Sequence, residues 1–198
     1  VASQVSSLLA PERFSQIKEK VIEIPEKEVR FEDPARIGVL ICHCGINIGK
    51  YVDIPEVVKY VKDLRNVIHC EDNLYSCSSD SQERIKELIL EKDLNRFIVA
   101  SCTPRTHESL FQETCLEAGM NKYLFEMVNI RDQCSWVHMK EKDAATEKTK
   151  DLIRMAVAKA KLLQPQNEET LNITPKALII GGGIAGMTAG LRIAEQGF

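Results

Sequence analysis

The feature that most constrains the fold is an alternation of short apolar runs with helical periods from residue 36 onward. The run Ile37-Gly-Val-Leu-Ile-Cys42 is followed by a segment whose apolar residues recur at positions 54, 57, 58, 61 and 64. A short continuous apolar run favours a buried strand, whereas recurrence every three or four residues favours an amphipathic helix. The pattern therefore predicts a strand at 37–42 and a helix at 54–64.

The same strand and helix unit recurs along the chain. Strands are predicted at 67–70, 97–100 and 122–128, and helices at 78–90 and 106–118, with a loop after the fourth strand. Four strands separated by helices predict an α/β fold with a parallel, doubly wound sheet. Helix-end signals agree with this prediction, since Ser78 and Thr106 can cap the second and third helices and Gly119 can end the third.

Composition and proline positions suggest a division into domains. Residues 1–35 are charged and broken by three prolines, and with short apolar pieces such as 21–24 they are predicted to form an arm or edge strand. The α/β domain is predicted at 36–163 and ends in a helix at 144–163. A polar, proline-bearing linker at 164–175 then leads into the start of a Rossmann-type domain at 176–198.

Charge and hydropathy exclude two classes of partner. Net charge is −3, so no basic field is available to attract nucleic acid. No apolar run approaches the roughly 20 residues that a membrane span requires, and the N-terminus lacks a secretion signal, which predicts a cytoplasmic protein. Because the chain begins with Val and stops shortly after residue 190, we expect it to be a fragment.

Seven cysteines in a reducing compartment favour metal ligation, catalysis or packing over disulfides. Four of them follow the four predicted strands: Cys44, Cys77, Cys102 and Cys134. Parallel strands have their carboxyl ends at one edge of the sheet, where open α/β folds bind ligands. Four thiols at that edge could share a tetrahedral zinc ion or an iron–sulfur cluster, and their spacing does not distinguish the two metals. The alternative is that these cysteines are small buried hydrophobic residues.

The other three cysteines are interpreted differently. Cys70 lies inside a predicted strand and Cys115 inside a predicted helix, so both are expected to be packing residues. Cys42 shares a strand face with Cys44 and could replace it as a ligand. Cys44 is preferred because it lies beside Gly45, where a cluster can approach the backbone. A thiol–disulfide oxidoreductase using Cys42 and Cys44 is less favoured, since redox pairs usually have the spacing Cys-x-x-Cys.

Polar segments surround these cysteines and supply N–H donors that could tune a metal centre. Four side chains could donate to cluster sulfur or gate protons: Arg105, His107, Arg131 and His138. The alternative is that each is a solvated loop residue or a helix cap. Trp136, the chain's single tryptophan, is expected in the core or at an interface.

A second motif, Gly181-x-Gly183-x-x-Gly186, follows an apolar run at 176–180 that is predicted to be a strand. In a dinucleotide fingerprint the glycines allow a tight turn, close approach of a pyrophosphate and packing of the next helix. Ile184 and Ala185 lie within the motif. The acidic residue expected about 20 positions later is not in the chain, so this chain alone is not expected to bind the cofactor.

Five strings carry a resemblance to a known family: Ile41-Cys-His-Cys-Gly-Ile-Asn-Ile48, Glu71-Asp-Asn-Leu-Tyr-Ser-Cys77, Ala100-Ser-Cys-Thr-Pro-Arg-Thr-His-Glu108, residues 125–138, and Gly181 to Gly186. Together they resemble the A subunit of heterodisulfide reductase, the iron–sulfur flavoprotein of methanogens and some anaerobic bacteria. The resemblance covers residues 36 to the end and identifies the chain as an N-terminal fragment.

The resemblance implies a [4Fe-4S] cluster bound by Cys44, Cys77, Cys102 and Cys134, and an FAD site that begins at Gly181, Gly183 and Gly186. It implies an oxidoreductase subunit that relays electrons between FAD and clusters in flavin-based bifurcation. Its implied partners are the B and C subunits, a hydrogenase or formate dehydrogenase, and ferredoxin. The disulfide of coenzyme M and coenzyme B is reduced on the B subunit, so no catalytic residue is expected here and the fragment alone is expected to be inactive. The alternative function is a zinc-stabilised interaction module that docks on a flavoenzyme without a redox role.

Overall fold

The computed structural model describes residues 2–12, 24–30 and 32–197. The chain divides into two compact units, one formed by Ile22–Asn167 and the other by Val1–Val21 together with Glu168–Phe198. None of the helices in the described ranges combines the length and apolarity needed to cross a bilayer.

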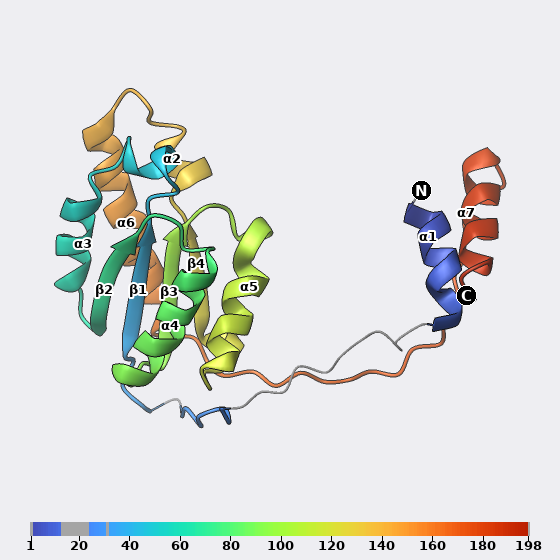
Figure 1. Ribbon diagram of the computed structural model, residues 1–198, viewed down its shortest axis with the longest axis horizontal. Helices are drawn as coiled ribbons and strands as arrows, with labels where there is room; N and C mark the ends of the chain where they lie inside the picture. Colours follow the sequence, from blue (N-terminus) through green and yellow to red (C-terminus); the bar gives the residue numbers. More distant parts are fainter. Residues whose placement is uncertain (1, 13–23, 31, 198) are drawn as a thin grey trace. The chain divides into compact units, whose positions relative to one another are not determined.

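The larger unit is built on a four-stranded parallel sheet. Its strands are β1 (Ile37–Cys42), β2 (Val67–Asn73), β3 (Arg96–Ser101) and β4 (Phe125–Asn129), in the order β2-β1-β3-β4. The chain runs outward from β1 to β2 and then crosses back to β3, so the winding direction reverses between β1 and β3 (Figure 1). The parallel, doubly wound sheet predicted from the sequence is confirmed.

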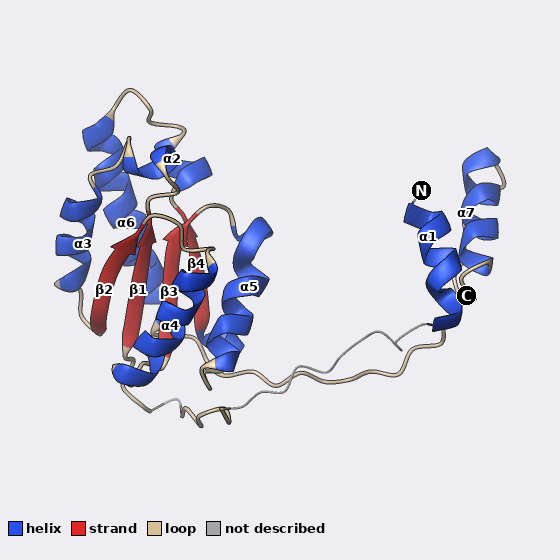
Figure 2. Cartoon of the chain, viewed as in Figure 1, coloured by secondary structure: helices blue, strands red, loops and turns tan. Residues whose placement is uncertain are grey.

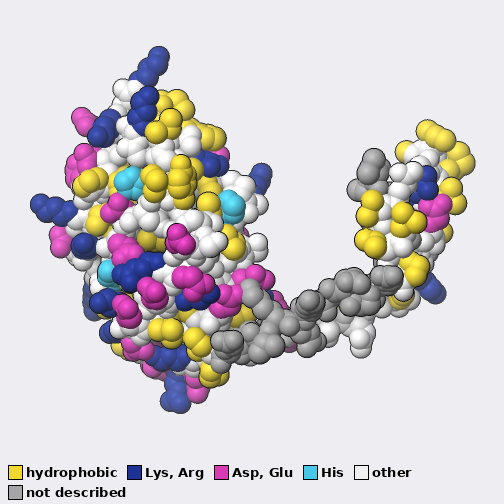
Figure 3. All heavy atoms as spheres, viewed as in Figure 1, with side chains coloured by type: hydrophobic (Ala, Val, Ile, Leu, Met, Phe, Trp, Pro, Cys, Tyr) yellow, Lys and Arg dark blue, Asp and Glu magenta, His cyan; other side chains and the backbone are white. Residues whose placement is uncertain are grey.

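Helices cover both faces of this sheet, as Figure 2 shows. The longer helices are α3 (Ile54–Lys62), α4 (Ser79–Glu91), α5 (Pro104–Glu117) and α6 (Lys142–Ala160). Val39 and Ile41 of β1 pack with residues of α3 and α6 in one hydrophobic cluster, whereas Leu40 packs with residues of α4 and α5 in the other. Because alternate residues of a strand point to opposite faces, a continuous apolar strand supplies both layers of the core. On the face of this unit that Figure 3 shows, many Lys, Arg, Asp and Glu side chains lie at the surface.

Two of the three predicted helix-end signals are confirmed. Ser78 is the N-cap of α4, and its hydroxyl accepts a hydrogen bond from the Ser81 backbone N–H. Gly119 follows α5 with φ 76°, the left-handed conformation that ends many helices. The prediction for Thr106 is wrong, because α5 begins two residues earlier at Pro104 with Thr103 as its N-cap. Proline is favoured in a first helical turn, where its missing N–H needs no partner.

Short helices occupy three connections: α2 (Ile46–Gly49), the 3-10 helix η2 (Lys122–Leu124) and the π-helix η3 (Arg131–Ser135). The predicted start of the fourth strand, residue 122, is three residues too early, because residues 122–124 form η2. The segment predicted as a loop after this strand contains η3. The other strands and helices predicted between residues 36 and 163 differ from the structure only at their ends; for example, β2 continues to Asn73 and α6 runs from Lys142 to Ala160.

The smaller unit contains α1 (Ala2–Leu9), η1 (Ala10–Glu12) and α7 (Ile184–Ala194), and α1 contacts α7. Of the two alternatives predicted for residues 1–35, an edge strand is not found in the described part, since residues 2–9 are helical and residues 24–30 form no strand. The arm remains a prediction. Residues 21–23 of the predicted apolar piece lie outside the described residues.

The strand predicted at 176–180 is also absent. A strand needs a neighbour to satisfy its backbone groups, and no described strand pairs with this segment. Leu178 and Ile180 are accordingly 87% and 91% exposed. The predicted linker at 164–175 has no regular secondary structure, and the domain boundaries remain a prediction.

Candidate metal centre

The candidate site lies at the carboxyl end of the sheet, next to the reversal between β1 and β3. Cys42 ends β1 and Cys44 follows it, Cys77 lies between β2 and α4, and Cys102 directly follows β3. Burial raises the pKa of the Cys77 thiol, and the nearby charges of Cys42, Cys102 and Cys44 raise it further. The thiols of Cys42, Cys44 and Cys102 therefore lie within electrostatic range of Cys77. This edge is where doubly wound sheets bind ligands.

Cys42 has the most extensive hydrogen bonding of these four. Its buried Sγ accepts hydrogen bonds from the backbone N–H groups of Cys44, at 3.2 Å, and Ser76, at 3.3 Å. Backbone donors of this kind stabilise sulfur that carries negative charge or binds a metal. The sequence favoured Cys44 over Cys42, but these contacts give Cys42 the environment of a ligand.

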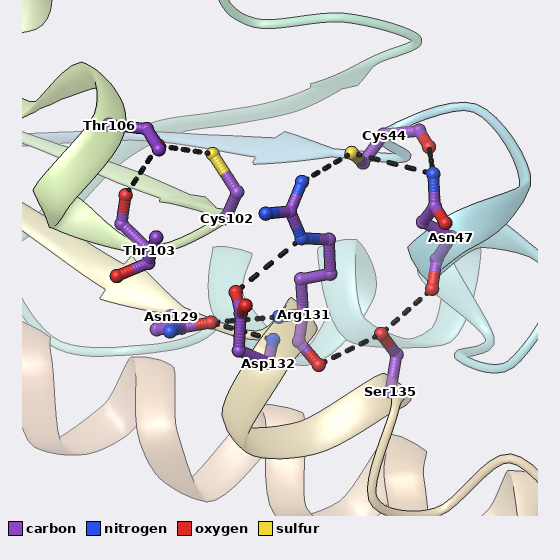
Figure 4. A network of polar contacts seen from close by, with 9 residues as sticks. All are labelled: Cys44, Asn47, Cys102, Thr103, Thr106, Asn129, Arg131, Asp132 and Ser135. Carbon is purple, nitrogen blue, oxygen red and sulfur yellow. Dashed lines mark hydrogen bonds and ion pairs between the residues drawn. The ribbon is translucent and has the colours of Figure 1, made fainter.

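Cys44 lies in a tight turn. Its φ is 47°, and Gly45 follows with φ 56°, so a non-glycine residue occupies the left-handed region directly after β1. Such conformations cost energy and are concentrated at functional sites. The partly exposed Cys44 Sγ lies 3.5 Å from Arg131 Nη1, as Figure 4 shows.

Cys77 and Cys102 each precede the N-cap residue of a helix, Ser78 of α4 and Thr103 of α5. Cys77 is exposed, while Cys102 is buried with its Sγ 3.5 Å from Thr106 Oγ1. Thr106, predicted as a helix cap, instead donates its hydroxyl to the Thr103 carbonyl and contacts this sulfur.

Cys134, predicted as the fourth ligand, lies in a different environment. It is completely buried in η3, and its thiol contacts the Ala145 carbonyl at 3.2 Å and Thr149 Oγ1 at 3.3 Å, both in α6. Burial raises the pKa of this thiol. The structure therefore groups Cys44, Cys77 and Cys102 with Cys42, and it packs the Cys134 side chain against α6.

Of the four side chains predicted to donate to metal-bound sulfur, one hydrogen-bonds a cysteine sulfur in the described part of the chain and three do not. Arg131 contacts Cys44, whereas His138 pairs with Glu141 at 3.2 Å. Among the described residues, no hydrogen bond joins Arg105 or His107 to a cysteine. Trp136 is 42% exposed and so does not belong to the core, and the Arg131 guanidinium lies over its ring at 4.7 Å.

Thiol side chains at this edge are of the type that binds zinc or iron–sulfur clusters. In this structure, however, they are not arranged around a common point. Three buried polar atoms here lack a hydrogen-bond partner: Ser101 Oγ, Arg131 Nε and Asp132 Oδ2. Buried polar atoms are normally paired. Arg131 Nε and Asp132 Oδ2 lie 3.4 Å apart as an ion pair, so Ser101 Oγ is the one of the three that could hydrogen-bond an additional group. Within the described ranges, no three His, Cys, Asp or Glu side chains are positioned to hold a metal ion. Binding would therefore require these side chains to rearrange.

Cys70 and Cys115 are packing residues, as the sequence predicts. Their exposed fractions are 1% and 0%. Burial raises the pKa of Cys70 to about 12 and also raises the pKa of Cys115. Neither thiol is available as a thiolate ligand near neutral pH.

In the glycine motif, Gly181 has φ +112° and Gly183 is the N-cap of α7, whose first residues are Ile184 and Ala185. A Cβ at Gly186 would lie 1.9 Å from the Gly181 carbonyl oxygen, so only glycine fits there. The turn and helix of a dinucleotide fingerprint are present, while the strand that should precede them is not formed.

The fold and the site together define an α/β domain with thiols at its switch point, carried on a chain that also has a glycine-rich turn of the dinucleotide-binding type. No family model matches the chain. A protein of Archaeoglobus profundus, described as like the A subunit of heterodisulfide reductase, is 54% identical to the chain over 167 residues. The match covers 84% of this chain and 24% of that protein.

Two further relatives agree. The second of two iron–sulfur A subunits of the CoB–CoM heterodisulfide reductase of Methanopyrus kandleri is 51% identical over 167 residues, covering 84% of this chain and 26% of the relative. The A subunit of the H2:CoB–CoM heterodisulfide,ferredoxin reductase of Methanothermobacter thermautotrophicus is 50% identical over 173 residues. This match covers 87% of the present chain and 26% of the relative. The chain therefore belongs to the family of heterodisulfide reductase A subunits, and it spans about a quarter of the length of these relatives.

Proposed function

We propose that this chain provides the iron–sulfur domain of a heterodisulfide reductase A-type subunit, which is an oxidoreductase component that relays electrons. The observation that carries the proposal is that Cys42, Cys44, Cys77 and Cys102 all lie at the carboxyl edge of the sheet, beside its switch point. Thiolates are the usual protein ligands of iron–sulfur clusters, which carry single electrons. The chain's own contribution is to hold the sulfur ligands, supply N–H donors to them and limit solvent access.

The proposed ligands are Cys44, Cys77 and Cys102 of a [4Fe-4S] cluster, together with a fourth thiol. The family resemblance suggests Cys134 as the fourth ligand, but its contacts with α6 would have to break first. Cys42 is supported by its two N–H donors and by its electrostatic effect on Cys77. We therefore favour Cys42.

The role of the whole subunit extends beyond this chain. We propose that the motif Gly181, Gly183, Ile184, Ala185 and Gly186 begins an FAD site, which residues beyond this chain would complete. The subunit would then pass electrons between FAD and clusters in flavin-based bifurcation. Its proposed partners are the B and C subunits, a hydrogenase or formate dehydrogenase donor, and ferredoxin, which appears in the names of four relatives. The fragment alone is proposed to be inactive, and a cytoplasmic location remains a prediction.

Anaerobic reconstitution of the chain with iron and sulfide tests the proposal. We expect about four iron and four sulfide per chain, with visible absorption that bleaches on addition of dithionite. Zinc bound in place of iron, with no absorption that responds to dithionite, would instead support the zinc-stabilised interaction module. Replacing Cys70, which is buried in the core, by alanine is the control and should leave the iron content unchanged.

A further inference from the structure

The loop of residues 74–78, between β2 and α4, packs against the Cys42 sulfur. The Ser76 backbone N–H donates a hydrogen bond to Cys42 Sγ at 3.3 Å, and the Cys42 thiol lies 3.8 Å from the Leu74 carbonyl oxygen. Cys42 is 4% exposed and Ser76 is 1% exposed, whereas Leu74 and Cys77 of the same loop are exposed. The loop therefore helps to bury one thiol at the sheet edge and carries another that is open to solvent.

A buried glutamine of α4 ties this loop to a second helix. Gln82 Nε2 donates to the Ser76 carbonyl at 2.7 Å, and Gln82 Oε1 accepts a hydrogen bond from the Thr114 hydroxyl of α5. Gln82 is 9% exposed and Thr114 is 3% exposed. The nitrogen and the oxygen of the Gln82 amide are thus both paired inside the protein, in a bridge that runs from α5 through α4 to the loop.

Other hydrogen bonds hold the loop less firmly to its surroundings. Ser76 Oγ donates to Asn73 Oδ1 at 2.7 Å, but this bond forms within the turn itself. Toward the turn after β1, the Gly45 N–H donates to the Leu74 carbonyl at 3.3 Å. The bond from Gln82 to Ser76 is shorter and more deeply buried than this one. Buried hydrogen bonds are costly to leave unmade, so Gln82 should contribute strongly to the position of the loop.

We propose that Gln82 is a positioning residue that latches the 74–78 loop against Cys42 and so limits how often this sulfur becomes accessible to solvent and to thiol reagents. The latch belongs to the metal-free chain, so the inference goes beyond the proposed function and does not depend on it. A loop opens locally at a free-energy cost set by the contacts that break. Removing the Gln82 amide leaves its buried partners unpaired in the closed arrangement, which favours the open one.

Alkylation of the metal-free, reduced 198-residue chain with N-ethylmaleimide tests the latch, with the label located by peptide fragmentation in a mass spectrometer. The rate for Cys42, divided by its rate in the urea-unfolded chain, measures how often the loop opens. Gln82→Leu keeps the size of the side chain but removes the amide, and we expect Cys42 to react about ten times faster or more in this variant. Glu83→Gln is the matched control, because Glu83 is an exposed neighbour on α4 paired with Lys86, and it should keep the wild-type rate.

Two other buried thiols separate loop opening from general loss of stability. Cys70 and Cys115 are 1% and 0% exposed, and both should keep their wild-type rates in Gln82→Leu. An unchanged Cys42 rate in that variant would overturn the inference, as would a parallel rise at all three buried thiols. A wild-type chain in which Cys42 reacts as fast as the exposed Cys77 would show that the loop does not shield it, which also overturns the inference.

A second variant keeps the test decisive if circular dichroism shows that Gln82→Leu does not fold. Thr114→Val keeps the shape of the α5 side chain but removes the hydroxyl that Gln82 Oε1 accepts from. We expect Cys42 to react faster than in wild type in this variant as well, with a smaller change because the bond from Gln82 to Ser76 can still form. A wild-type Cys42 rate in a folded Thr114→Val chain would then count against the latch.

Discussion

At the scale of single residues, the direction of a side chain decides which cysteines can act together. The strand pattern correctly predicted that Cys44, Cys77 and Cys102 leave the sheet at one edge. It could not predict that Cys134 turns toward α6, because strand ends determine where the backbone goes and not which way a thiol points within the following helix. The donors to Cys42 Sγ are backbone N–H groups of Cys44 and Ser76, and side-chain patterns carry no signal for such contacts.

The choice of fourth ligand gives the first prediction. We expect Cys42→Ala to reduce the iron bound after reconstitution from about four to below about one per chain, while Cys134→Ala retains nearly all of it. The reason is that Cys42 shares the edge with the other thiols, whereas Cys134 is held by α6. Iron and sulfide analysis of both variants, with folding checked by circular dichroism, makes the comparison. Iron loss in Cys134→Ala but not in Cys42→Ala would restore the ligand set implied by the family resemblance.

The buried Cys70 thiol gives a prediction about pH. Burial raises its pKa from 9.0 to about 12 in the folded chain, so the folded state keeps a proton that the unfolded state releases. Its contribution to stability is complete below pH 9.0 and is lost as the pH rises toward about 12. Within that window the free energy of unfolding should fall by up to about 1.4 kcal/mol per pH unit for this group.

Urea denaturation of the metal-free chain at about pH 8 and about pH 10.5 checks this. Cys70→Ala should show a smaller decrease between the two pH values than wild type. Val61→Ala, which truncates another fully buried side chain, should lose stability at both pH values but keep the wild-type decrease. An unchanged pH dependence in Cys70→Ala would contradict the expected titration.

At the scale of elements, the sequence predicted well where periodicity was strong. The four strands and helices α3 to α6 were found because each has a long apolar pattern between turn residues. The five-residue η3 was missed because Arg131 to Ser135 is polar and too short to show a period. The segment 176–180 has the composition of a strand but no described neighbour to pair with, so propensity alone did not produce one.

The attachment of α6 to β3 gives a third prediction. Arg96 is 2% exposed, and its guanidinium donates to the carbonyls of Ala160, Leu163 and Asn95 at 3.2, 3.0 and 3.0 Å. A cation at a helix C-terminus satisfies carbonyls that have no partner within the helix. We expect Arg96→Met to lower the free energy of unfolding by about 2 to 4 kcal/mol, because it leaves these carbonyls without donors.

Chemical denaturation followed by circular dichroism measures this loss, with Arg154→Met on the exposed face of α6 as the matched control. The control should change stability by less than about 0.5 kcal/mol. A similar small change in Arg96→Met would mean that α6 is held by its apolar face alone.

At the scale of the whole molecule, both hydrophobic clusters lie within Ile22–Asn167, and none of residues 168–197 is buried. Folding stability follows the apolar area removed from water, so the larger unit should carry almost all of it. We expect a chain of residues 22–167 to unfold cooperatively within about 3 °C of the 198-residue chain and to bind the same amount of iron. A chain ending at residue 141 lacks α6 and the cover of one sheet face, so it should lose cooperative unfolding. Thermal circular dichroism and iron analysis compare the three chains, and failure of the 22–167 chain to unfold cooperatively would show that the smaller unit contributes to the core's stability.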